Sequence, residues 1–232
     1  LFAIDIDGDS DIDVLSGGQY TGLRWFENDG SENFTSYNIT SSDVSVRLVY
    51  ALDLDADGDI DIFSSSPHYN SGYGITWYEN DGSENFTSHN ITTTGQDYSF
   101  AVDMDGDGDI DVLSTDIALY ENNGSQSFTM HTIDTSANTP IYIDGIDIDS
   151  DGDMDMLTAL NNGAEVIWYE NDGSENFTSH TIIQTNGGFW DAFAIDIDGD
   201  SDIDVLSVSP ADQGNGITWY ENDGSENFTS HS

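Results

Sequence analysis

One acidic nonapeptide, present five times, constrains this chain more than any other feature of its 232 residues. It reads DIDGDSDID at 5–13, DLDADGDID at 53–61, DMDGDGDID at 103–111, DIDSDGDMD at 147–155 and DIDGDSDID at 196–204. Each copy is followed by an apolar run, a variable loop, an aromatic segment and a polar decapeptide. Parts that recur in a fixed order at a regular spacing indicate a repeat architecture, so the chain is predicted to consist of five units.

The polar decapeptide ENDGSENFTS occurs at 27–36, 79–88, 170–179 and 221–230. The third unit is the divergent one: it reads ENNGSQSFTM at 121–130 and has Leu119 where the other units have a tryptophan. The Asp-Gly or Asn-Gly pair inside the decapeptide is typical of two-residue hairpin turns, because both residues tolerate positive φ. We therefore expect a tight turn between the third and fourth strands of each unit.

Short runs of alternating apolar and polar residues predict strands, and no window has the periodicity of a helix. In the second unit we expect strands at 60–64, 75–80, 86–91 and 99–103, the last shared with the start of the next unit. Four antiparallel strands per unit match one blade of a β-propeller. The predicted fold class is therefore all-β, a β-propeller of four-stranded antiparallel blades, either a five-bladed ring or part of a larger array. The prediction is a single repeat domain over 1–232, with blades at about 1–50, 51–100, 101–144, 145–193 and 194–232.

The charge balance excludes two classes of partner. The chain has 46 Asp and Glu residues against 2 Lys and Arg, a formal net charge of −44. Nucleic acids and anionic membranes are both bound through basic residues, so neither is an expected partner. No apolar stretch approaches the length of a membrane span, and no cysteine is present to form disulfides or thiolate sites.

The spacing of the aspartates predicts calcium binding. Carboxylates at every second residue repel one another unless a cation lies among them. Calcium takes several oxygen ligands, which positions 1, 3, 5 and 9 offer as carboxylates and position 7 as a backbone carbonyl. The predicted ligands, about one ion per repeat, are Asp5, Asp7, Asp9, Asp11 and Asp13; Asp53, Asp55, Asp57, Asp59 and Asp61; Asp103, Asp105, Asp107, Asp109 and Asp111; Asp147, Asp149, Asp151, Asp153 and Asp155; and Asp196, Asp198, Asp200, Asp202 and Asp204.

Neighbouring positions of the nonapeptide support this interpretation. A small residue at position 6 allows a sharp bend, and an isoleucine or methionine at position 8 is expected to anchor the loop from below. An EF-hand is rejected because position 12 is serine or threonine instead of glutamate and the flanks are strands. Zinc is rejected for these loops because the histidines lie elsewhere in the sequence.

The loop D-x-D-x-D-G-x-x-D, followed by DVLS and later by WYEND, resembles the FG-GAP/VCBS-type repeats, whose best-known members are integrin α-subunit propellers. The resemblance covers essentially the whole chain and implies calcium at the five loops. The Phe-Gly and Gly-Ala-Pro signatures are missing, so an integrin-like mode of ligand binding is not implied. The VCBS-like subset, common in secreted microbial proteins, is the most similar.

In an up-and-down blade, the acidic loops and the decapeptide turns share one face, and the variable loops share the other. Loops on a rigid scaffold commonly bind ligands, so the variable face is predicted to bind glycan or protein. Aromatic and histidine side chains suit both kinds of ligand. The predicted contacts are Tyr20, His68, Tyr69, Tyr73, Tyr98, Tyr142, Phe189 and Trp190.

The predicted function is an extracellular, calcium-stabilised recognition or adhesion module. The alternative is a structural subunit that self-assembles into a surface layer or filament, and a propeller-type lyase is less favoured. No catalytic residue is expected, because saturated oxygen ligation leaves no open metal position. Extracellular location is expected because cytosolic calcium is too low for such loops. Possible N-glycosylation sites, read from the Asn-x-Ser/Thr pattern, are Asn33, Asn38, Asn85, Asn90, Asn123, Asn176 and Asn227.

Overall fold

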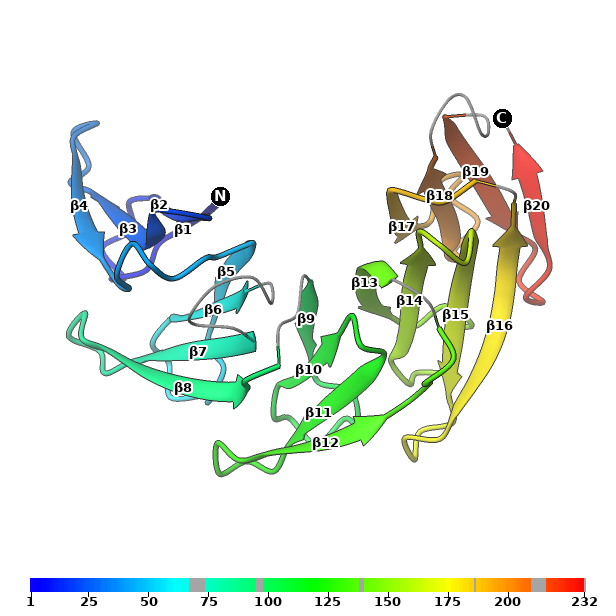
Figure 1. Cartoon of the computed structure of the whole chain (residues 1–232), viewed down its shortest axis with the longest axis horizontal. Helices are drawn as coiled ribbons and strands as arrows, with labels where there is room; N and C mark the ends of the chain where they lie inside the picture. Colours follow the sequence, from blue (N-terminus) through cyan, green and yellow to red (C-terminus); the bar gives the residue numbers. More distant parts are fainter. Residues whose placement is uncertain (67–73, 95–97, 138–139, 186, 210–215, 232) are drawn as a thin grey trace. The chain divides into compact units, whose positions relative to one another are not determined.

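The computed structural model describes residues 1–66, 74–94, 98–137, 140–185, 187–209 and 216–231. Within these ranges the secondary structure is twenty β-strands and no helix, so no helix there could span a membrane (Figure 1). The strands form five separate four-stranded sheets. Each sheet uses four strands that follow one another in the sequence, so each sheet corresponds to one repeat.

The first sheet contains β1 (Phe2–Ile4), β2 (Asp13–Gly18), β3 (Gly22–Asn28) and β4 (Phe34–Asn38). The second contains β5 (Leu48–Leu52), β6 (Asp61–Ser66), β7 (Gly74–Asn80) and β8 (Phe86–Thr92). The third contains β9 (Ser99–Val102), β10 (Asp111–Ser114), β11 (Ala118–Asn122) and β12 (Phe128–Thr132). The fourth contains β13 (Pro140–Ile146), β14 (Asp155–Leu160), β15 (Glu165–Asn171) and β16 (Phe177–Gln184). The fifth contains β17 (Asp191–Ile195), β18 (Asp204–Val208), β19 (Ile217–Asn222) and β20 (Phe228–His231).

The predicted fold class is confirmed: the chain is all-β and consists of four-stranded antiparallel propeller blades. Neighbouring strands run antiparallel, for example β14 and β15, where Leu157 pairs with Trp168. One strand assignment was wrong. The strand expected at 99–103 is present as β9, but it belongs to the third sheet, and the second sheet begins with β5. The reason is that β5 pairs with β6 across the acidic loop, with Leu52 opposite Asp61.

The chain divides into two compact units. One contains Leu1–Ser99 with Asn123–Phe128, and the other contains Phe100–Asn122 with Thr129–Ser232. A single repeat domain with the blade limits given above therefore stays a prediction.

Each unit has a core between adjacent sheets. In the first unit, Trp25 of β3 packs with Val49 of β5 and Tyr78 of β7. In the second unit, Trp168 of β15 packs with Ala192 of β17 and with other apolar side chains of the fifth sheet. Large aromatic side chains contribute much of the energy of such cores. Two of the repeated tryptophans thus pack in a core shared by adjacent sheets.

Candidate functional site

The acidic loops join the first and second strands of each sheet, and their first aspartate folds the loop back on itself. In the first loop, Asp5 Oδ1 accepts a hydrogen bond from the backbone N–H of Gly8 at 2.8 Å. Asp5 Oδ2 accepts a second bond from the N–H of Ser10 at 2.9 Å. Asp103 makes the corresponding bonds with Gly106 and Gly108. The first aspartate thus fixes the bend that brings the later carboxylates close to it.

The ninth aspartate is buried at the start of the second strand, and both of its carboxylate oxygens accept hydrogen bonds in the first loop. Asp13 accepts bonds from the N–H of Ile6 at 3.2 Å, the Trp25 indole at 3.0 Å and the N–H of Asn28 at 2.8 Å. Burial is the main cause that raises the pKa of the equivalent carboxyl groups, to about 6 for Asp61 and about 7 for Asp111. This position therefore ties the acidic loop to the third strand, a role that the sequence did not indicate.

Three carboxylates converge in each of four loops, with ligand atoms within 4.8 Å of one another. Positions 1, 3 and 9 converge in three loops and positions 1, 3 and 5 in the second. The groups are Asp5, Asp7 and Asp13; Asp53, Asp55 and Asp57; Asp103, Asp105 and Asp111; and Asp147, Asp149 and Asp155. In the fifth loop, Asp196 makes the same hydrogen bonds as Asp5, to the N–H groups of Gly199 and Ser201.

The side chains at position 7 do not join these groups. Asp59 lies against Gly82 of the turn that follows β7, and Asp153 lies against Gly173 in the same way. Only the backbone carbonyl was predicted to be the ligand at this position, and that prediction is compatible with a side chain that points elsewhere.

Two observations show that the loops suit a hard cation. Asp55 Oδ1 and Asp147 Oδ1 are buried, and neither has a hydrogen-bond partner among the described residues. A buried carboxylate oxygen without a partner is costly unless a cation completes its surroundings. Burial, together with the charge of neighbouring carboxylates, also raises the pKa of the position-3 groups, such as Asp105 and Asp149. The donor set is entirely oxygen, which fits calcium.

The apolar anchor of the loop is mainly at position 2, and the predicted anchor at position 8 holds only in part, since Ile60 and Ile203 are partly buried against the cores. Ile12, at position 8 of the first loop, is 54% exposed. The residues at position 2 are 3% exposed or less in the first four loops: Ile6, Leu54, Met104 and Ile148. The physical reason is the buried aspartate at position 9. It accepts a hydrogen bond from the backbone N–H of position 2 and so holds the side chain of that residue inside.

The decapeptide forms a five-residue loop, so the predicted two-residue turn is wrong. Between β3 and β4, the N–H of Asp29 donates to the carbonyl of Asn33 at 3.1 Å. Positive φ occurs at Gly30 and at Glu32, with values of 71° and 64°. The Asp29 carboxylate accepts bonds from the N–H of Ser31 and from the Asn33 side chain, at 2.9 Å each. These local bonds give the loop its shape and explain why Asp and Asn recur at fixed positions.

The decapeptide also completes the acidic loop, which is the main functional feature that the sequence reading missed. Asn28 Nδ2 donates to the carbonyl of Ile12, and its N–H donates to Asp13. The same contact to the carbonyl at position 8 recurs in every repeat, and its donors are Asn28, Asn80, Asn122, Asn171 and Asn222. The signal in the sequence was the presence of this asparagine even in the divergent third repeat.

At the opposite end of the sheets, the predicted ligand contacts have different surroundings. Tyr20 is 75% exposed and Trp190 is 61% exposed. The guanidinium of Arg47 lies 5.0 Å from the ring centre of Tyr98 and donates a hydrogen bond to its hydroxyl. His68, Tyr69 and Tyr73 lie outside the described residues.

Two of the predicted contacts need correction. Phe189 is 1% exposed and belongs to the core of the second unit, where its aromatic ring is more stable than at the surface, so it does not line a binding face. Tyr142 lies within β13, packs against the same core and donates a hydrogen bond to Asp144 at 2.7 Å. Burial and the Asp144 charge raise the pKa of Tyr142.

An open depression of about 460 Å³ lies at the variable-loop end of the first sheet. Its lining is mostly polar and consists of Thr21, Arg24, Asn38, Ile39, Thr40, Ser41 and Ser42. Arg24 Nε donates to Asn38 Oδ1 at 2.9 Å. Among the ion pairs of the described residues, none joins Arg24 to a carboxylate, although the chain is strongly acidic.

Six of the seven possible glycosylation sites fall into two structural groups, and the seventh, Asn123, accepts a hydrogen bond from the N–H of Ser125. In the decapeptide loops, the side-chain N–H groups of Asn33, Asn85, Asn176 and Asn227 already donate to an aspartate. Asn38 and Asn90 lie on fourth strands and accept bonds from Arg24 and Thr76. Modification of any of these residues stays a prediction.

Comparison with solved structures shows the fold. A lectin of Agrocybe aegerita that recognises non-reducing terminal N-acetylglucosamine is 20% identical, with a TM-score of 0.69 over 99% of this chain and 65% of the lectin chain. The V. cholerae biofilm matrix protein Bap1 is 22% identical, with a TM-score of 0.57 over 83% of this chain and 29% of Bap1. The chain thus spans less than two thirds of either protein.

Comparison with curated protein sequences gave no match. The FG-GAP-like repeat family matches at 5–64, 53–114, 103–158 and 147–207. Each match begins at one acidic loop, includes the following acidic loop and ends in the strand after that second loop. These matches together cover most of the sequence. The chain belongs to the FG-GAP-like repeat family.

Proposed function

We propose that this chain is an extracellular, calcium-stabilised recognition module that binds a glycan through the loop end opposite the acidic loops. The observation that carries the proposal is the polar depression beside Arg24. Hydroxyl and amide side chains line it, and such groups bond well to sugar hydroxyls. Exposed aromatic rings, which stack on sugar faces, are available at the neighbouring Tyr20 and at Trp190.

The comparisons support this choice of ligand class. The Agrocybe aegerita lectin, which has a similar fold, recognises non-reducing terminal N-acetylglucosamine, and Bap1 is a biofilm matrix protein. At 20–22% identity this likeness concerns the fold. The ligand class therefore rests on the depression and on the exposed aromatic residues.

In this proposal calcium stabilises the scaffold. Extracellular calcium modules bind the ion at about 10⁻⁴–10⁻³ M. At millimolar calcium, each occupied loop then adds roughly 0.4–1.4 kcal/mol to the free energy of unfolding, since the ion binds only the folded state. Cytosolic calcium is far below this range, which favours a location outside the cell. We propose binding without catalysis, because the same carboxylates recur in equivalent loops of every repeat.

A second candidate, self-assembly into a layer or filament, is favoured by one surface of the fifth sheet. Ile197, at position 2 of the fifth acidic loop, is 40% exposed, whereas its counterparts in the other four loops are buried. Phe193 and Ile195 of β17 are 51% and 44% exposed. These side chains correspond to residues that pack on a neighbouring sheet elsewhere in the chain. The candidate predicts concentration-dependent oligomers in light scattering, which Phe193→Ser would abolish.

A glycan array, probed in 2 mM calcium and again in EDTA, tests the main proposal. We expect selective retention of a glycan class in calcium, reduced at least tenfold by Arg24→Gln and by Tyr20→Ala. Phe34→Ala is the matched control, because Phe34 is an exposed aromatic residue (53%) at the acidic-loop end. Absence of any retained glycan, or equal binding by the Arg24 variant and the wild type, would contradict the proposal.

A further inference from the structure

A histidine of the fourth strand pairs with a glutamate of the third strand in four of the five repeats. The distance between Nε2 and the glutamate oxygen is 2.6–2.8 Å in each pair. In repeats two, four and five the imidazole also stacks on the tryptophan of the third strand, with ring centres 4.5–4.6 Å apart. The stacked pairs are His89 with Glu79 and Trp77, His180 with Glu170 and Trp168, and His231 with Glu221 and Trp219.

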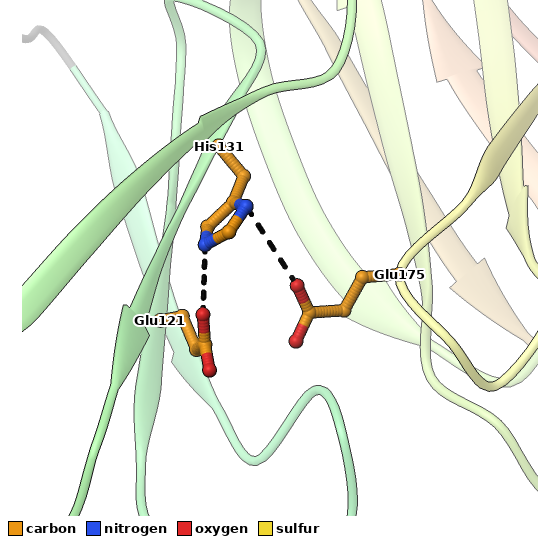
Figure 2. A group of neighbouring side chains, drawn as sticks. All are labelled: Glu121, His131 and Glu175. Carbon is orange, nitrogen blue, oxygen red and sulfur yellow. Dashed lines mark hydrogen bonds and ion pairs between the residues drawn. The ribbon is translucent and has the colours of Figure 1, made fainter.

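The third repeat differs because Leu119 replaces the tryptophan. His131 still pairs with Glu121 through Nε2, at 2.7 Å. Its other ring nitrogen, Nδ1, faces Glu175 of the loop between β15 and β16, at 3.9 Å (Figure 2). Among the described histidines, His131 alone lies within 4.0 Å of two carboxylates. All three side chains belong to the second unit.

The arrangement of His131 between two glutamates lacks a positive charge beside Nδ1 when the imidazole is neutral. A neutral histidine that donates from Nε2–H to Glu121 carries a lone pair on Nδ1. That lone pair would face the negatively charged oxygen of Glu175, which is unfavourable without a cation between the two atoms. The cation is either a proton, which makes His131 an imidazolium, or a metal ion. At the tetrahedral angle, two metal–ligand bonds of about 2.0–2.1 Å hold their ligand atoms about 3.4 Å apart, so the observed 3.9 Å must close by about 0.5 Å when an ion binds.

We propose that His131 Nδ1 and the Glu175 carboxylate bind a divalent transition metal of the Zn²⁺ type, with Glu121 as the residue that orients the imidazole. A carboxylate behind the far ring nitrogen is the usual partner of a metal-binding histidine, since it fixes the tautomer and raises the basicity of the ligand. Three side chains that could each offer one ligand atom lie within 4.8 Å here. Water completes the coordination, so the site is weaker than a closed four-ligand site.

The site would select a different metal from the acidic loops. An imidazole nitrogen suits zinc, copper or nickel, whereas calcium prefers oxygen ligands alone. Bound there, the ion would connect β12 of the third sheet to the β15–β16 loop of the fourth. The third repeat, which carries the site, is also the repeat in which Leu119 replaces the tryptophan, so His131 has no indole on which to stack.

Zinc titration by calorimetry, on the full chain with calcium held at 2 mM, tests the proposal. We expect one zinc site that His131→Gln and Glu175→Gln each weaken at least tenfold, with a smaller loss for Glu121→Gln. His180→Gln is the matched control, because it removes the same residue from the same place in the next repeat, and should leave binding unchanged. Leu119→Trp should weaken binding, since it restores the stacking partner. Thermal melts in calcium check that each variant is folded.

A nitrogen NMR spectrum of the histidine rings gives a second readout. Zinc should shift the Nδ1 resonance of His131 and leave that of His180 in place. An equal loss of binding in His131→Gln and His180→Gln would overturn the proposal. So would a spectrum in which His131 stays doubly protonated at neutral pH while zinc is present, because the cation would then be a proton only.

Discussion

The Asp153 carboxylate lies directly against Gly173, so close that a Cβ atom at Gly173 would come within 2.5 Å of Asp153 Oδ2. Asp153 is at position 7 of the fourth acidic loop, and Gly173 is in the decapeptide loop of the same sheet. The same contact joins Asp59 to Gly82 and Asp202 to Gly224. The acidic loop and the decapeptide loop are the two most repeated parts of the sequence. They thus form one structural unit, in which each requires the other.

Gly173→Ala should therefore destabilise the protein. The backbone at Gly173 has φ of +72°, a region that costs an alanine about 1–2 kcal/mol, and the contact with Asp153 adds to that cost. Gly216→Ala is the control, because Gly216 has a similar φ of +78° with no atom near the added Cβ. Chemical denaturation in calcium should show a larger loss for Gly173→Ala. Equal losses in the two variants would show that the Asp153 contact is unimportant.

Asn171→Ala should cost more than Asn28→Ala. Asn171 is 1% exposed, and its side chain donates to the carbonyls of Met154 and Met104, the latter in the acidic loop of the neighbouring third repeat. Among the described residues, the Asn28 side chain donates only to the carbonyl of Ile12, in the acidic loop of its own repeat. A buried carbonyl left without a partner costs about 1–3 kcal/mol, so the difference between the variants should be of that order. Urea denaturation of both in calcium measures it, and a larger loss for Asn28→Ala would contradict the assignment.

The repeat period, the strands and the acidic loops could be predicted because each depends on local sequence. Alternation of apolar residues predicted β6, β7 and β8, and the fixed spacing of aspartates located the loops. The unit to which β9 belongs was missed, because strand pairing across an acidic loop is not visible in the pattern of a single strand.

The errors at individual positions have a common cause. Position 8 is apolar in every loop, yet Ile12 is exposed, because the backbone at position 2 is the part that bonds to the buried Asp13. Phe189 was assigned to a binding surface because it lies in a variable segment, but it packs in the core. Sequence alone does not indicate which apolar residue of a loop points inward. The role of Asn171 was missed because its partners are backbone carbonyls, which leave no trace in residue identity.

Asp144→Asn should change the pH dependence of stability. Burial raises the pKa of Asp144 above its ordinary value of 3.8, and the hydrogen bond from Tyr142 only partly opposes this. The pKa of Asp144 is thus higher in the folded protein than in the unfolded chain. Its contribution to the stability of the folded state is therefore complete below the unfolded pKa and is lost as the pH rises through the folded pKa. An asparagine can still accept the bond from Tyr142 and carries no charge to bury.

We therefore expect the stability of Asp144→Asn relative to the wild type to increase between pH 4 and pH 7. Denaturation of the two proteins at both pH values gives this difference, in which effects of pH on the acidic loops cancel. A relative stability that stays constant, or that falls as the pH rises, would show that Asp144 is not destabilised by burial.

Removal of calcium should lower the melting temperature by roughly 5–25 °C. Roughly 0.4–1.4 kcal/mol from each of five loops sums to about 2–7 kcal/mol, a large part of the stability of a typical domain, about 5–15 kcal/mol. Calorimetric melts with EDTA and after return of calcium measure the effect. Magnesium should restore it poorly, because Mg²⁺ demands near-ideal octahedral geometry and gives up water reluctantly. A melting temperature that EDTA leaves unchanged would remove the basis of the calcium assignment.

Two variants of the fourth loop show whether calcium acts at the converging carboxylates. Asp149 belongs to the group with Asp147 and Asp155, whereas the Asp153 side chain lies against Gly173. Asp149→Asn should therefore reduce the calcium stoichiometry by one and lower the melting temperature in calcium. Asp153→Asn should keep the stoichiometry, because only its backbone carbonyl is expected to bind the ion. Loss of one calcium ion in both variants would show that position 7 binds through its carboxylate and that its contact with the turn is replaced when the metal enters.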